Sequence, residues 1–77
     1  MGVHLAEVLR YARTARGLSM AQAAEAAGLS RSAWWRLETG RRDRPHDPRA
    51  IAEAVGLREG TVRSAIAADL RCAEGAE

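Results

Sequence analysis

Apolar residues follow a helical spacing along the whole chain, and glycines divide this spacing into short segments. In the first segment the apolar positions recur at i, i+3, i+4 and i+7, which predicts a helix from about Val3 to Ala15. These positions are Leu5, Val8, Leu9 and Ala12. Valine and isoleucine never alternate with polar residues over the length of a strand. The pattern therefore predicts an all-α fold, and the length of 77 residues predicts one domain, over residues 1–72.

Helix start and stop signals define the second and third helices. Ser19 begins an S-x-x-Q capping box, and the helix that follows runs to the residue before Gly28. Ser30 is an N-cap candidate for the third helix, which continues until Gly40 terminates it. These boundaries predict two short helices joined by a tight turn.

Two further helices complete the predicted fold. Asp47 followed by proline is typical of an N-cap with proline at the first helical position, so we expect a fourth helix over Pro48 to Val55. The fifth helix starts between Arg58 and Thr61 and ends near Ala68 to Leu70. We expect residues 73–77 to form a disordered tail.

The segment from Ser19 to Glu38 satisfies the requirements of a helix-turn-helix. Such a unit needs a small residue where its helices cross, a glycine where the chain reverses, and apolar residues on the inner side of the second helix. Ala24, Gly28, and the pair Trp34 and Leu37 provide these features in turn. The residues that then project outward, where a recognition helix meets base edges, are Arg31, Ser32, Trp35 and Arg36. For Trp35 a dimer contact is the alternative to the DNA side.

Positive charge is concentrated in one part of the chain. The segment Ser30 to Arg49 holds six arginines against three acidic residues, a net charge of +3, whereas the rest of the chain has a net charge of −1. This distribution is typical of a phosphate-binding surface, although a solvated loop is the alternative. All 12 basic side chains are arginine, which points to a GC-rich coding sequence of a bacterium or its phage.

The sequence gives little support for a disulfide, a metal site, an enzyme active site or a membrane span. Cys72 is the one cysteine, so neither an intramolecular disulfide nor a cysteine-based zinc site can form, which fits a cytoplasmic protein in the bacterial nucleoid or in a phage-infected host. His4 and His46 lie far apart in the sequence, and we expect no metal, cofactor or small-molecule ligand. No nucleophile motif, phosphate loop or paired carboxylates indicate an enzyme, and no apolar run is long enough for a membrane span.

Three segments at matching offsets, LRYARTARGLS, AQAAEAAGLSRSAWWRLETGRR and PRAIAEAVGL, carry a family resemblance. Over Val8 to Val62 the chain resembles the Cro/repressor-like (Xre-type) helix-turn-helix family of phage and bacterial transcriptional regulators. The resemblance implies a compact five-helix, lambda-repressor-like DNA-binding domain with the helix-turn-helix at its second and third helices.

The same resemblance implies roles for individual residues. Arg13 forms a partly buried ion pair with Glu38, and Met20 stands where the family commonly has a glutamine that contacts a phosphate. Trp34 replaces the usual isoleucine or valine of the core, beside a small Ala23 where a larger leucine is common. The positions expected to contact the DNA backbone are Ser19, Met20, Ser30, Arg41, Arg42 and Arg44.

These observations predict a repressor or autoregulator of phage, plasmid or mobile-element origin that binds double-stranded DNA. One recognition helix covers few base pairs, so we expect a homodimer on an inverted repeat. Val62, Ile66 and Leu70 form the expected dimer surface, although much of that stripe packs on the first helix in the alternative interpretation. The alternative function is a protein interaction module that uses the same fold without binding DNA.

Overall fold

The computed structural model describes residues 3–41 and 46–75, with side chains as far as residue 71. This part of the chain consists of five α-helices and contains no strand, which confirms the all-α prediction. The helices are α1 (Val3–Ala15), α2 (Met20–Ala27), α3 (Arg31–Glu38), α4 (Pro48–Ala54) and α5 (Glu59–Gly75).

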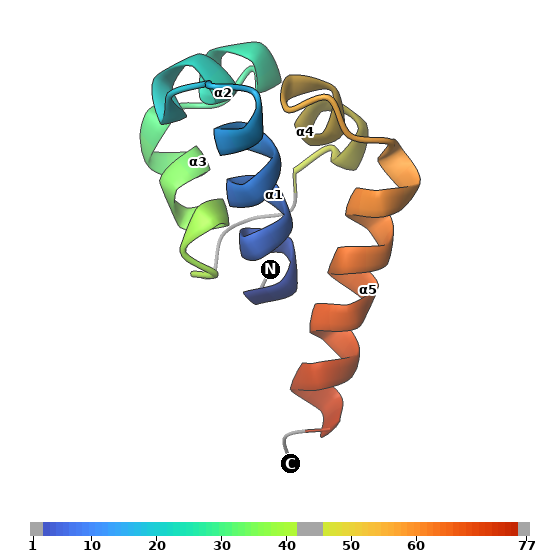
Figure 1. Ribbon diagram of the computed structural model, residues 1–77. Helices are drawn as coiled ribbons and strands as arrows, with labels where there is room; N and C mark the ends of the chain where they lie inside the picture. Colours follow the sequence, from blue (N-terminus) through green and yellow to red (C-terminus); the bar gives the residue numbers. More distant parts are fainter. Residues whose placement is uncertain (1–2, 42–45, 76–77) are drawn as a thin grey trace.

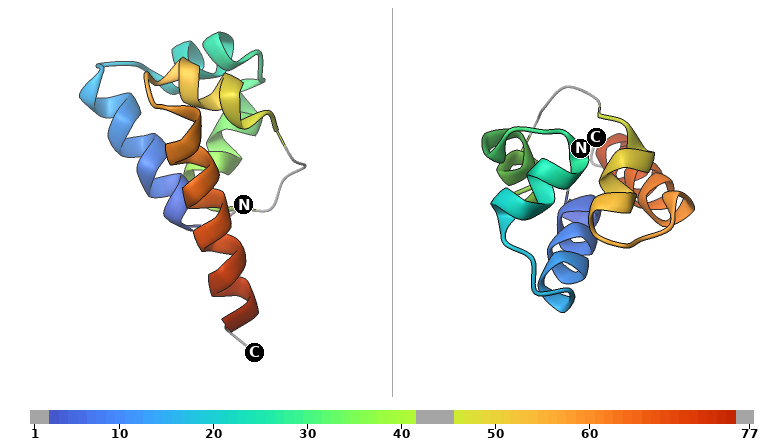
Figure 2. Two further views of the ribbon diagram at one scale, coloured as in Figure 1. Left: turned by 90° about the vertical axis from the view of Figure 1, so that its right-hand side faces the viewer. Right: turned by 90° about the horizontal axis from the view of Figure 1, so that it is seen from above.

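Helix α1 lies between two pairs of helices (Figures 1 and 2). It packs against α3 on one side and against α5 on the other. Helix α2 packs against α3 and α4, and α4 packs against α5, so that each helix has at least two neighbours. The five helices therefore enclose one core, and α3 keeps one side open to solvent.

The core combines a few large side chains with many alanines. Trp34 and Ala23 are both fully buried, so a large residue and a small one fill the same interior. Val8, which the sequence placed on the apolar stripe of the first helix, is only half-buried at the edge of the core. The largest fully buried apolar side chains are Trp34, Leu5, Leu9, Leu37, Ile51, Val55 and Val62.

Four of the helices end in the same way, with a glycine that has a positive φ. At the end of α2, Gly28 has a φ of 72°, and the N–H of Leu29 donates to the carbonyl of Ala24 at 2.8 Å. This is a Schellman closure, which only a residue tolerant of left-handed backbone makes without strain. The residues that directly follow the four glycines are Leu18, Leu29, Arg41 and Leu57.

Helix α5 is longer than the sequence predicted. It begins at Glu59, inside the predicted interval, but it continues to Gly75, past the end expected near Ala68 to Leu70. Asp69, just before this additional stretch, accepts hydrogen bonds from the backbone N–H groups of His4 at 2.8 Å and Leu5 at 3.1 Å. A carboxylate on α5 thus caps the start of α1 and ties the two helices together. The domain boundary at residue 72 stays a prediction.

Candidate nucleic-acid interface

Helix α3 separates its side chains into a buried side and an exposed side. Trp34 and Leu37 have no exposed surface, and Glu38 has only 2%. Because a helix completes a turn in 3.6 residues, burying these three positions directs their neighbours to the opposite side. The exposed residues of that opposite side are Arg31, Ser32, Trp35 and Arg36, which the sequence placed there.

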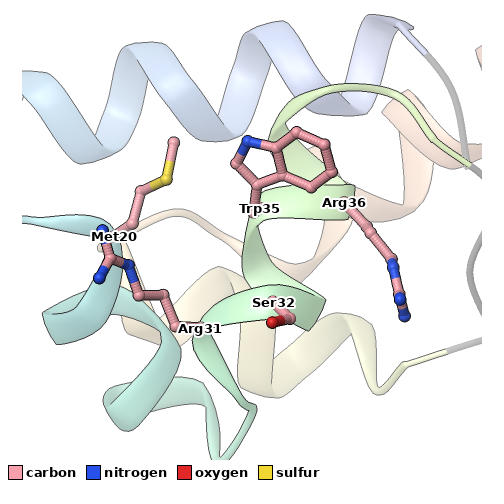
Figure 3. Close-up of a pocket in the computed structure, with 5 residues that line it drawn as sticks. All are labelled: Met20, Arg31, Ser32, Trp35 and Arg36. Atoms are coloured by element: carbon pink, nitrogen blue, oxygen red, sulfur yellow. The ribbon is translucent and has the colours of Figure 1, made fainter.

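These four residues line a hollow together with Met20, the first residue of α2. The hollow has a volume of about 440 Å³ and is open to solvent. Figure 3 shows Met20 and Trp35 on neighbouring helices, with the Arg31 side chain extending toward Met20 and the Arg36 side chain pointing away on the other side. The tight turn between α2 and α3 brings Met20, which lies 11 to 16 positions earlier in the sequence, beside the recognition-helix candidates, and linear spacing does not show this proximity.

A buried polar cluster supports the inner side of α3. Nε of Arg13 lies 2.7 Å from Oε2 of Glu38, and its Nη2 donates to Oε1 at 3.0 Å. A further guanidinium nitrogen, Nη1, donates to the carbonyl of Leu18 at 2.8 Å, across the turn that follows α1. The structure thus contains the Arg13–Glu38 pair that the resemblance implied, and it joins α1 to the end of α3.

Trp34 is a third member of this cluster that sequence reasoning missed. Its indole N–H donates to Oε2 of Glu38, so the tryptophan both fills the core and satisfies a buried carboxylate. The four-residue spacing between Trp34 and Glu38, which places them on the same side of a helix, was the available signal. Within the described part of the chain, no buried side-chain nitrogen or oxygen lacks a hydrogen-bond partner.

Trp35 has 43% of its surface exposed and carries a cation on its ring. Cζ of Arg41 lies 5.1 Å from the centre of the Trp35 ring, within the range of a cation–π interaction. The backbone N–H of Arg41 also donates to the carbonyl of Arg36 at 3.0 Å, as part of the closure at Gly40. The structure therefore pairs a residue predicted to face the bases with one predicted to contact the backbone.

Ser19 and Ser30 are N-caps, as the sequence indicated. The Ser19 hydroxyl accepts from the N–H of Gln22, and the Ser30 hydroxyl accepts from the N–H of Ala33, both at 3.1 Å. In each case the hydroxyl hydrogen can still donate to another group. Arg42 and Arg44, two of the predicted backbone contacts, lie outside the described residues.

The predicted dimer surface on α5 needs a correction. Val62 is fully buried in the core, so it has no surface to offer a second copy of the chain. Ile66 is half-buried against the core, whereas Leu70 is 62% exposed. Val62, at the start of the apolar stripe, packs inside the monomer, where α5 contacts both α1 and α4.

The described residues contain neither a metal-binding cluster nor a membrane-spanning helix. No three histidine, cysteine or acidic side chains within this part of the chain lie close enough to hold a metal ion together. No helix in residues 3–41 and 46–75 combines the length and the apolar character that crossing a membrane requires.

Comparison with known proteins places this geometry in a family. No curated protein matches the chain. A family described as "Helix-turn-helix domain" matches residues 4–66, which cover α1 from its second residue, all of α2 to α4, and the first part of α5. This match agrees with the resemblance to Cro/repressor-like regulators and points to a DNA-binding regulator in general. With α2 and α3 as its helix-turn-helix, the chain belongs to the helix-turn-helix domain family.

Proposed function

We propose that this protein is a sequence-specific, double-stranded DNA-binding transcriptional regulator, which acts as a repressor or autoregulator of phage, plasmid or mobile-element origin. The observation that carries the proposal is the two-sided character of α3. Its buried side anchors the helix through Trp34 and Glu38, and its exposed side presents two arginines, a serine and a tryptophan. An α-helix fits the major groove, where a guanidinium pairs with O6 and N7 of guanine.

Residues around the exposed side of α3 provide the contacts to phosphate groups. The hydroxyl groups of Ser19 and Ser30 accept hydrogen bonds as N-caps and keep their own hydrogens available to donate to a phosphate oxygen. Arg41, Arg42 and Arg44 add positive charge to the sequence that follows α3. Such contacts set the register of the protein on the duplex, and base contacts select the sequence.

The protein acts as a homodimer on an inverted repeat in this proposal. One recognition helix reads only a few base pairs, so two copies with half-site centres about 34 Å apart read a useful operator length. Ile66 and Leu70 leave apolar surface on the outer part of α5, which supports a contact there. Binding across a promoter then represses transcription by blocking access to it.

Selection of bound duplexes from random DNA, followed by sequencing, tests the proposal. We expect enrichment of one palindromic sequence by the wild-type chain and loss of that enrichment in the double variant Arg31→Ala, Arg36→Ala. The double variant Arg58→Ala, Arg63→Ala is the matched control, because it removes two exposed arginines near the start of α5. It should enrich the wild-type sequence. A wild-type chain that enriches no sequence contradicts the proposal and favours a protein interaction module.

A further inference from the structure

We propose that the hollow between Met20 and Trp35 binds the C5-methyl group of a pyrimidine in the major groove. These two side chains then set a preference for thymine or 5-methylcytosine at one position of each half-site. The inference rests on the proposed function, because it requires α3 to enter the groove. It assigns to Met20 a contact with a base in addition to any contact with the DNA backbone.

The hollow has an apolar base and a polar rim. Met20 is half-buried and Trp35 is 43% exposed, and both side chains are apolar, whereas the three other lining residues, Arg31, Ser32 and Arg36, are exposed and polar. Figure 3 shows the thioether of Met20 and the indole of Trp35 reaching into the same space from two helices. A polar group of a base edge would lose water on entering between these side chains without gaining a hydrogen bond. An apolar group would gain contact with both.

Trp35 is held in place for this contact. Arg41 lies over the indole ring, and its backbone is fixed by the hydrogen bond to the carbonyl of Arg36. Arg41 directly follows Gly40. At the three other glycine closures the residue after the glycine is leucine, and each of those leucines is half-buried. The closure at the end of α3 instead has an arginine, whose guanidinium group packs over the exposed indole ring of Trp35.

The C5-methyl group is the apolar feature that base edges present in the major groove. Thymine carries it, and cytosine carries it only when methylated at C5. The arginines of the rim hydrogen-bond to guanine and cannot recognise a methyl group, so the apolar pair adds a kind of discrimination that they lack. A methionine suits this role because its thioether is flexible and polarisable and packs well against aromatic rings.

The addition or removal of single methyl groups in the DNA tests the inference. Each thymine of the selected operator is replaced in turn by uracil, which removes the methyl group and leaves base pairing and phosphates intact. We expect one position in each half-site at which uracil weakens binding about fourfold, the value for one buried methyl group. In a second set, that base pair becomes cytosine–guanine, with and without a C5-methyl group on cytosine. Methylation of the cytosine at C5 should strengthen binding of that duplex by about fourfold as well.

Protein variants then locate the effect. In Met20→Ala and in Trp35→Ala the difference between thymine and uracil at that position should disappear. Tyr11→Ala is the control, because Tyr11 is a highly exposed aromatic residue that lines a different hollow on α1. It should keep the fourfold difference, and circular dichroism should show wild-type helix content in all three variants.

The possible outcomes separate the inference from the proposed function. The protein could bind the operator tightly and selectively, yet with equal affinity for thymine and uracil at every position. This result, which is expected if Trp35 packs on a sugar, overturns the inference and leaves the proposed function standing. A uracil effect that persists in both hollow variants also overturns it. Failure to bind any duplex selectively overturns the inference together with the proposed function.

Discussion

Glu38 is an acidic side chain at the end of a helix whose exposed side we assign to DNA. A carboxylate facing phosphates would repel them, but Glu38 points the other way and has 2% of its surface exposed. Its two oxygens accept hydrogen bonds from Arg13 and from the indole of Trp34. Removing one partner of such a pair leaves the other charge buried and unpaired, which costs more than the pair contributes.

Glu38→Gln and Arg13→Met should each lower the free energy of unfolding by about 3 kcal/mol, the lower end of the range for buried pairs, because Arg13 retains 14% exposure. The double variant should lose less than the sum of the two. Urea or thermal unfolding of the four proteins measures the coupling. The exposed pair Arg49 and Glu53 is the control, and the same changes there should alter stability by less than about 0.5 kcal/mol. Strict additivity of Arg13→Met and Glu38→Gln would remove the pairing claim.

Arginines on and beside α3 should differ in what they recognise. Arg31→Ala or Arg36→Ala should weaken operator binding by about 1–3 kcal/mol and relax the preference at one base pair. Arg41→Ala should instead lower the salt slope by about one unit and weaken binding to operator and random duplexes alike, apart from the thymine contact of Trp35, which Arg41 supports. Titrations of operator and random duplexes at several salt concentrations separate the two effects. If Arg31→Ala and Arg36→Ala both bound operator and random duplexes like the wild-type protein, the assignment of base contacts would be wrong.

At the scale of the helices, the glycine closures fix where each element ends, but their surroundings differ. Gly28 and Gly56 have φ angles of 72° and 71°, so the backbone strain of an added side chain is the same at both. A Cβ atom at Gly28 would meet nothing within 4 Å, whereas a Cβ atom at Gly56 would overlap Nη1 of Arg16. Arg16 therefore rests on the C-terminal end of α4, where a positive charge is favourable.

Gly28→Ala should lower the free energy of unfolding by about 1 kcal/mol, through backbone strain alone. Gly56→Ala should cost about 0.3–1 kcal/mol more, because it displaces Arg16 from the end of α4. Thermal unfolding of Arg16→Ala and of the double variant with Gly56→Ala provides the check. In the Arg16→Ala background, Gly56→Ala should lower the free energy of unfolding by no more than Gly28→Ala lowers it in the wild-type protein. Equal losses at the two glycines in the wild-type background would contradict this account.

Helix α1 depends on α5 for its N-terminal cap. Asp69→Ala removes the acceptor of the His4 and Leu5 N–H groups and should destabilise the protein by about 1–2 kcal/mol, as the loss of an N-cap does. Hydrogen exchange measures the local effect, and the Leu5 amide should exchange faster. Asp47→Ala, which removes the cap of α4, should leave that amide unchanged. Unaltered exchange at Leu5 in Asp69→Ala would show that the contact does not cap α1.

At the scale of the whole molecule, α5 has two parts with different surroundings. Its first part packs against α1 and α4, and its last part extends beyond the other helices (Figure 2). Val62 lies in the first part and is buried, and Leu70 lies further along and is exposed. A contact between two copies through α5 therefore requires the region around Leu70 and not the whole stripe.

Leu70→Glu should dissociate the proposed dimer and leave helix content and thermal stability of the monomer near those of the wild type. The two-fold symmetry of such a contact brings each new charge into the interface twice. Val62→Glu should instead unfold the chain, because a charge would enter the core. Sedimentation with and without operator DNA measures the number of copies. A wild-type protein that binds a non-palindromic site as one copy would contradict the dimer.

Helix type, order and most boundaries could be predicted from the sequence because they depend on neighbours along the chain. The caps at Ser19, Ser30 and Asp47 and the closures at Gly28 and Gly40 involve residues within five positions of one another. The predicted end of α5 was wrong because neither glycine nor proline interrupts the chain between Leu70 and Gly75, and the helix continues through this stretch.

The sequence by itself determined which residues of α3 face inward and which face outward, since burial of Trp34 and Leu37 follows from helical periodicity. Only the tertiary structure decided what those residues meet. Met20 lines the hollow with Trp35, the Trp34 indole bonds to Glu38, and Asp69 reaches the start of α1. Contacts of this kind depend on how helices cross, and periodicity fixes the direction of a side chain on its own helix without fixing which other helix lies in that direction.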